Sequence, residues 1–149
     1  MALHTLGETL AQSGALIADR VLRSFLEAYF VVADRLLARG GASVREDELI
    51  QECLRVGRQY QLQRRIVSAE AVSAELYKTG LRLADNRGLL QGDAGALAHG
   101  REVFVAELHD VLRRLEILRG WERVNDPRRE GNISARDRLE NRPVVANAR

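Results

Sequence analysis

The hydrophobic positions between residues 21 and 37 predict a central helix. They recur at 4-3-4-3 spacing at Leu22, Leu26, Tyr29, Ala33 and Leu36. Four further positions widen this stripe: Val21, Phe25, Val32 and Leu37. A stripe of this width indicates a helix that other elements cover on more than one side. Gly40 and Gly41 predict its end, because glycine readily adopts the left-handed conformation that terminates many helices.

Three more helical segments are predicted around this central one. Upstream, a preceding segment with a break at Ser13 and Gly14 has apolar positions at Leu3, Leu6, Leu10 and Ile17. Ser43 and Glu46 have capping-box spacing and predict the start of a second helix, with an apolar face at Leu49, Cys53, Val56 and Tyr60. Ser68 is the expected N-cap of a third, which ends at Gly88 and has an inner stripe at Val72, Leu76, Gly80 and Leu83.

A fourth helix follows the glycine-rich stretch from residue 91 to 100, which we expect to be a flexible connection or a frayed helix start. Its stripe is Phe104, Leu108, Val111, Leu115 and Leu118. Short connections between such stripes are typical of an all-α bundle of about four antiparallel helices. From Gly120 onward the periodicity stops. The sequence therefore predicts a helical domain at residues 1–118 and a disordered, flexible basic tail at residues 119–149.

Composition supports one helical domain and no membrane span. A length of 149 residues with 46% hydrophobic content suits a single core. Three Phe, three Tyr and one Trp leave the core to Leu, Val, Ala and Ile, a mixture that favours helices. No charge-free run approaches the ~20 apolar residues of a membrane-spanning helix. The first residues lack the pattern of a secretory signal.

The charge distribution argues against a nucleic-acid partner. Residues 1–118 carry 15 basic and 16 acidic side chains, a net charge of −1, whereas residues 119–149 carry 8 and 5, a net charge of +3. A nucleic-acid-binding domain normally shows a basic face. The nearly neutral domain therefore predicts no nucleic-acid binding.

The chain offers no candidate catalytic, metal-binding or cofactor-binding residue. His4, His99 and His109 have no partner at metal-ligand spacing. Cys53, the single cysteine, lies on an apolar face, which favours a packed thiol over a nucleophile. Phosphate-binding glycine loops and the GxSxG serine motif are also absent from the sequence.

Arginines near the end of the second predicted helix are the candidate contact residues. Arg58 and Arg65 are seven residues apart and share a face if the helix persists, and Arg64 lies beside them. We interpret Arg58, Arg64 and Arg65 as partner-contact candidates for a carboxylate, a lipid phosphate or an acyl carrier. The alternative is a solvated face with local pairs such as Glu52 and Arg55.

Three segments carry a resemblance to a known family: FLEAYFVVADRL, CLRVGRQYQLQRRI and SAEAVSAELYKTGLRLADNRGLL. Together they resemble the C-terminal helical region of bacterial and mitochondrial glycerol-3-phosphate acyltransferases, over roughly residues 10–118. The resemblance implies an accessory domain at the end of a longer, membrane-associated enzyme of phospholipid biosynthesis. That enzyme acylates the sn-1 position of glycerol 3-phosphate.

The catalytic motif of that family is missing. Its enzymes use a His-x-x-x-x-Asp pair as the base, but the residues five positions after the three histidines are Thr9, Phe104 and Arg114. The resemblance therefore implies a non-catalytic domain that docks on an acyltransferase catalytic domain, with no cofactor and with any membrane contact made through that partner. It implies a protein either free in the cytoplasm or peripheral at the inner face of the cell membrane. The alternative is a stand-alone interaction or regulatory module that self-associates.

Overall fold

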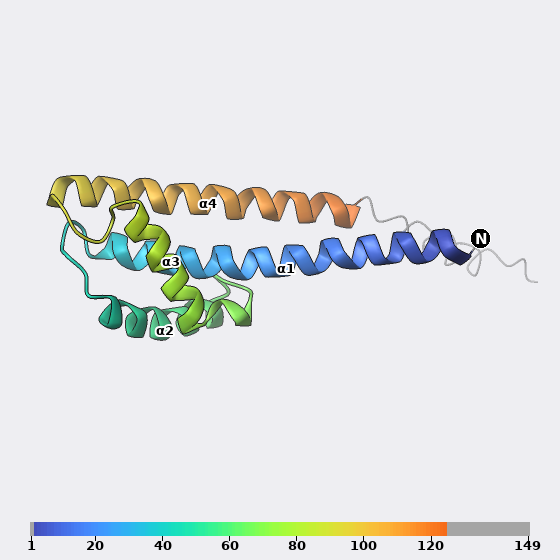
Figure 1. Cartoon of the computed structure of the whole chain (residues 1–149), viewed down its shortest axis with the longest axis horizontal. Helices are drawn as coiled ribbons and strands as arrows, with labels where there is room; N and C mark the ends of the chain where they lie inside the picture. Colours follow the sequence, from blue (N-terminus) through green and yellow to red (C-terminus); the bar gives the residue numbers. More distant parts are fainter. Residues whose placement is uncertain (1, 125–149) are drawn as a thin grey trace, which may run out of the picture. The chain divides into compact units, whose positions relative to one another are not determined.

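The described part of the chain is all-helical. The computed structural model describes the backbone of residues 2–124, with side-chain burial at residue 14, residues 17–121 and residue 124. Its elements are α1 (Ala2–Ala38), α2 (Glu46–Leu62), the short 3₁₀ helix η1 (Ala69–Ala71), α3 (Ala74–Asn86) and α4 (Ala94–Val124) (Figure 1). This confirms the predicted all-α class with four helices. The described residues divide into two units, one up to Arg114 and one from Leu115 onward.

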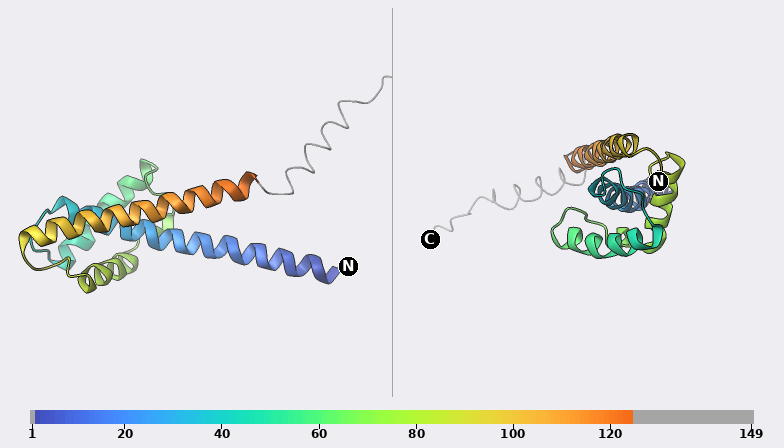
Figure 2. Two further views of the ribbon diagram at one scale, coloured as in Figure 1. Left: turned by 90° about the horizontal axis from the view of Figure 1, so that it is seen from above. Right: turned by 90° about the vertical axis from the view of Figure 1, so that its left-hand side faces the viewer.

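Within the first unit, α1 is the central helix. It packs most extensively against α3 and then against α2 and η1. Figures 1 and 2 show α2 and the first part of α4 running opposite to α1, while α3 crosses α1 obliquely. The ring centroids of Phe30 on α1 and His109 on α4 lie 6.4 Å apart. The helices gather around the C-terminal half of α1, and its N-terminal half extends beyond α2 and α3 (Figure 2).

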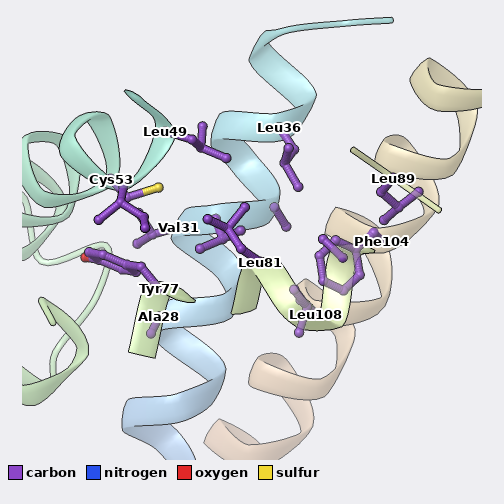
Figure 3. Close-up of a cluster of buried hydrophobic side chains, with 14 of the residues drawn as sticks. Ala28, Val31, Leu36, Leu49, Cys53, Tyr77, Leu81, Leu89, Phe104 and Leu108 are labelled. Atoms are coloured by element: carbon purple, nitrogen blue, oxygen red, sulfur yellow. The ribbon is translucent and has the colours of Figure 1, made fainter. Parts of the chain in front are cut away.

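The hydrophobic core lies where all four helices meet. Figure 3 shows Val31 and Leu36 from α1 facing Leu81 from α3, with Cys53 of α2 on one side and Phe104 of α4 on the other. The largest fully buried apolar side chains are Tyr77, Phe104, Leu36, Leu49, Ile66, Leu81, Leu97, Val31, Val32 and Cys53. Burial of the face of α2 that contains Cys53 is as predicted.

Two predicted helix starts are wrong. Helix α2 begins at Glu46 with Arg45 as its N-cap and without a side-chain cap, so Ser43 caps nothing. The acidic first turn, which includes Glu46, supplies negative charge at the positive end of the helix dipole. Helix α3 begins after Ser73, whose hydroxyl accepts from the Leu76 amide, and not after Ser68.

The inner stripe of α3 also differs in part from the predicted one. Gly80 is buried as expected, but its buried neighbours are Tyr77, Leu81 and Ala84. The predicted members Leu76 and Leu83 are only partly buried. The stripe is therefore rotated on the helix toward the oblique contact with α1.

Helix α1 differs from prediction in two ways. It is continuous through residue 14, where a break was expected. Glycine is tolerated within a helix at about 1 kcal/mol relative to alanine, so Gly14 does not end it. Val21 and Leu22 are each 51% exposed, so their part of the wide stripe is not covered by the described chain.

Most of the glycine-rich stretch from residue 91 to 100 is helical, because α4 begins at Ala94. The carboxylate of Asp93 accepts from the amide of Ala96 at 3.0 Å, which caps the helix at Ala94. Gly95 and Gly100 therefore lie inside α4. The helix continues to Val124, beyond the predicted domain boundary at residue 118. The rest of the predicted tail, residues 125–149, lies outside the described residues.

Gly57 and Gly80 lie inside helices at positions where a second helix approaches closely. A methyl group at Gly57 would collide with the Tyr77 hydroxyl of α3. A methyl group at Gly80 would lie 3.1 Å from the Tyr29 ring and 3.2 Å from a Val32 methyl group of α1. These glycines let α3 pack tightly against both α2 and α1.

Candidate partner-contact surface

The arginine candidates lie at and just after the C-terminal end of α2. Arg58, Arg64 and Arg65 are all exposed. The Arg65 guanidinium stacks 3.8 Å above the centroid of the Tyr60 ring, a cation–π contact that holds this side chain on its own domain. Within the described residues, the side chains of Arg58 and Arg64 have no ion-pair or hydrogen-bond partner. These two guanidinium groups are therefore available to a partner anion.

Arg64 occupies a backbone position that usually favours glycine. Its φ is 57°, the one positive value among the described non-glycine residues. The Arg64 amide donates to the Gln61 carbonyl at 3.0 Å and the Arg65 amide to the Tyr60 carbonyl at 2.8 Å, the hydrogen-bond pattern of a Schellman helix end. The equivalent residue after α3 is Gly88, with φ of 68°. Arginine at this position carries backbone strain that glycine avoids.

A second exposed surface lies on the N-terminal half of α1, and it is apolar. Ile17 is 63% exposed, Val21 and Leu22 are 51% exposed, and Phe25 is 36% exposed. Residues three and four positions apart share one side of a helix. These four side chains and the exposed Ala18 therefore form one surface, which we name the α1 face.

Next to the α1 face, a buried ion pair holds the link between α2 and α3. Glu27 is only 2% exposed and accepts from the Arg23 guanidinium at 3.0 Å. The same carboxylate accepts from the backbone amides of Val67 at 3.0 Å and Ser68 at 2.7 Å. Ser68 thus contributes its amide to α1 instead of capping α3. The contact also joins two of the segments that carry the family resemblance.

A polar network joins the C-terminal half of α1 to α2. The Tyr60 hydroxyl donates to Asp34, which also accepts from Arg35 at 2.6 Å. Arg39 donates to Glu52 at 2.6 Å. Burial, followed by the hydrogen bond to Asp34, raises the pKa of Tyr60. These groups satisfy one another, so the network is a structural connection.

Arg101 of α4 ties the ends of α1 and α3 together. Its side chain is fully buried and donates to the backbone carbonyls of Leu89 at 2.9 Å, Gly40 at 2.7 Å and Ala42 at 3.0 Å. Carbonyls after helix C-termini carry partial negative charge, which compensates the guanidinium. Its second terminal nitrogen is buried without a hydrogen-bond partner among the described residues. Burial, followed by the nearby charge of Arg39, lowers the pKa of Arg101.

The remaining groups show no arrangement for catalysis. Cys53 is fully buried, and this burial raises the pKa of its thiol to about 12, which disfavours the reactive thiolate. His99 and His109 are exposed on α4. In the part of the chain that the structure describes, no three His, Cys, Asp or Glu side chains are grouped to hold a metal ion.

Sequence reasoning missed the roles of Glu27 and Arg101, although both leave a local signal. Glu27 interrupts an apolar run and follows Arg23 at i,i+4 spacing. Arg101 lies within the stripe formed with Leu97 and Phe104. A charged residue inside an apolar stripe indicates a buried charge with dedicated partners.

No helix in the described range is both long enough and apolar enough to cross a bilayer.

These features define a small helical domain, and the comparisons with known proteins assign its family. The chain belongs to the family described as the glycerol-3-phosphate acyltransferase C-terminal region, which it matches over residues 3–93. This confirms the resemblance found in the sequence. No solved structure matches the chain.

Two similar proteins come from mycobacteria. Over 110 residues the chain is 46% identical to proteins named "Putative acyltransferase plsB1" in Mycobacterium bovis and Mycobacterium tuberculosis. This stretch is 73% of the present chain and 18% of each relative. The chain therefore spans less than a fifth of the length of these relatives.

Proposed function

We propose that this chain is the C-terminal helical domain of a glycerol-3-phosphate 1-O-acyltransferase-like protein of phospholipid biosynthesis, and that it acts by docking on an acyltransferase domain. The observation that carries the proposal is the family match over residues 3–93, combined with relatives in which the matched stretch is 18% of the length. A domain that makes up so small a part of a longer protein is expected to act together with the other parts of that protein.

The domain contributes binding and no chemistry of its own. The family base needs a histidine held by an aspartate five residues later, and neither His99 nor His109 is followed by one. The buried, protonated thiol of Cys53 is not a substitute nucleophile. Transfer of the acyl group therefore belongs to the partner domain.

The proposed docking also gives the exposed arginines a binding role. Arg58 and Arg64 are available for carboxylates on the partner or for phosphates at the inner face of the cell membrane, which the domain reaches through its partner. An exposed ion pair contributes only about 0–1 kcal/mol. These arginines therefore adjust docking, and an apolar surface has to supply most of its free energy.

A direct assay separates the catalytic from the docking role. The purified chain, given an acyl-CoA and glycerol 3-phosphate, should form no sn-1 acylated product above a protein-free control. The intact Mycobacterium tuberculosis relative serves as the reference. We expect a version without the matched 110-residue stretch to lose activity, and a version carrying this chain in its place to retain much of it.

Two results would count against the proposal. Sn-1 acylation by the chain alone would show that it is catalytic. A replacement that performs no better than the deletion would show that the chain cannot serve as the accessory domain.

The second candidate is a stand-alone module that self-associates, favoured by the exposure of the α1 face. It predicts a stable oligomer of the purified chain at micromolar concentration. Sedimentation of the free chain distinguishes the two, since the docking proposal predicts a monomer.

A further inference from the structure

We infer that the α1 face, made of Ile17, Ala18, Val21, Leu22 and Phe25, is the surface on which an acyltransferase domain of the longer protein docks. The inference rests on the proposed function and adds the location of the contact. Three features of the α1 face support this partner. They are its continuity with the packed half of α1, the charges around it and its small size.

The α1 face continues the packed stripe of the same helix. Val21 and Phe25 lie at 3- and 4-residue steps before Ala28 and Val32 and so lie on the same side of α1. Ala28 and Val32 are fully buried, and Gly80 of α3 approaches closely at Val32. α2 and α3 do not extend along the N-terminal half of α1 (Figure 2). α2 and α3 therefore leave the rest of the stripe uncovered.

The charges beside this face are already engaged within the chain. Arg20 lies 3.7 Å from Glu70, and Arg23 pairs with the buried Glu27. Asp19 also has an interaction within the chain. The large exposed side chains of the face itself are aliphatic or aromatic, which fits an apolar protein surface better than anionic lipid headgroups or nucleic acid.

The size of the face favours a domain of the same longer chain over a second copy. Only four large side chains and Ala18 make up the face, far fewer than the about 20–30 residues per side of a standard interface between separate proteins. A covalently linked partner needs less area, because the linkage supplies an effective concentration of about millimolar. The mycobacterial relatives place the matched stretch in such a longer chain.

Charged substitutions on the α1 face provide the test. The variant Ile17→Glu with Val21→Lys places an i,i+4 Glu–Lys pair on the face, a pairing that stabilises an isolated helix. The matched control is Gln59→Glu with Gln63→Lys, which places the same i,i+4 Glu–Lys pair at two exposed positions at the end of α2. Each pair adds one acid and one base, so the net charge stays the same.

Both pairs are made in the free chain and in the Mycobacterium tuberculosis relative that carries this chain in place of its matched stretch. In the relative, Ile17→Glu with Val21→Lys should reduce acyltransferase activity at least about tenfold, because charges buried in a contact without partners weaken it strongly. The control pair should retain activity. In the free chain, both pairs should leave the melting temperature nearly unchanged.

The outcomes separate the inference from the proposed function. If the unmodified replacement is active and Ile17→Glu with Val21→Lys is harmless, the location is wrong and the proposed function stands. If the free chain is a dimer that this pair dissociates, the face binds a second copy and the inference is overturned. If the unmodified replacement matches the deletion, the proposed function fails, and the inference falls with it.

Discussion

The two halves of α1 have similar apolar spacing but very different surroundings. Val32 and Leu36 in the C-terminal half are fully buried, whereas Ile17 and Val21 in the N-terminal half are 63% and 51% exposed. The same pattern of side chains therefore has two outcomes within one helix. A hydrophobic stripe shows which side of a helix is to be covered, and it does not show whether the covering element belongs to the same domain.

The packed half is covered because specific contacts bring the other elements back to it. Glu27 binds the link after α2, and Gly80 lets α3 approach α1. Arg101 holds the segments that follow α1 and α3. α2 and α3 do not reach the α1 face (Figure 2), which is why we assign it to a partner.

The largest predicted effect comes from removing the Arg101 side chain, which holds together the segments that follow α1 and α3. Arg101→Met should reduce the free energy of unfolding by about 3 kcal/mol or more, because three backbone carbonyls lose the donor that the buried guanidinium supplies. Urea unfolding followed by circular dichroism measures the change. Arg113→Met, at an exposed position on the same helix, should change it by less than about 1 kcal/mol. Equal losses in the free energy of unfolding would show that the hydrogen bonds of Arg101 do not hold these segments together.

Glycine-to-alanine substitutions should have opposite signs in the two regions. Gly57→Ala should destabilise by about 1–3 kcal/mol, because its methyl group collides with the buried Tyr77 hydroxyl. Gly14→Ala, in the exposed half of α1, should stabilise by up to about 1 kcal/mol, since no atom lies within 4 Å of the added methyl group. Thermal unfolding of both variants measures this. Destabilisation by Gly14→Ala would show that its side of the helix is packed in the free chain.

A smaller effect tests the arginine surface as a rival to the α1 face. Arg64→Gly should stabilise the free chain by about 0.5–1 kcal/mol, because glycine accepts the positive φ without strain. Chemical unfolding measures this gain. In the mycobacterial relative carrying the chain, the same substitution should reduce activity less than Ile17→Glu with Val21→Lys. The reverse order would assign the main contact to the arginines.

Local patterns predicted the helical class, the ends of α1 and α3 at Gly40 and Gly88, and the burial of Cys53. Each depends on residues within a few positions of one another. The predicted start of α3 at Ser68 was wrong because Ser68 precedes the separate 3₁₀ helix η1, and its amide binds Glu27, which is 41 residues away. Contacts at such separations depend on how the helices come together, and helical spacing alone does not contain that information.

The candidate surface was predicted only in part, for a related physical reason. Exposure of Arg58, Arg64 and Arg65 agrees with a surface role, while their contact with a partner stays a prediction. The width of the α1 stripe correctly indicated more apolar surface than one neighbour covers. Its pattern could not show that the uncovered part would be residues 17–25, because that depends on where α3 ends its contact with α1.

Docking through the α1 face is tested most directly by the reactivity of a thiol placed on that face. Val21→Cys introduces an exposed thiol, whereas the native Cys53 is fully buried and has a pKa raised to about 12. Maleimide labelling, located by mass spectrometry, should be fast at position 21 in the free chain. It should be at least about tenfold slower in the mycobacterial relative carrying the chain, as expected for a site that reacts only after the contact opens.

Leu62→Cys, at a position that is 86% exposed, is the matched control and should label rapidly in both proteins. If the α1 face docks on an acyltransferase domain, position 21 is protected from labelling in the relative, whereas position 62 is labelled rapidly. Equally rapid labelling of position 21 in the free chain and in an active relative would contradict it.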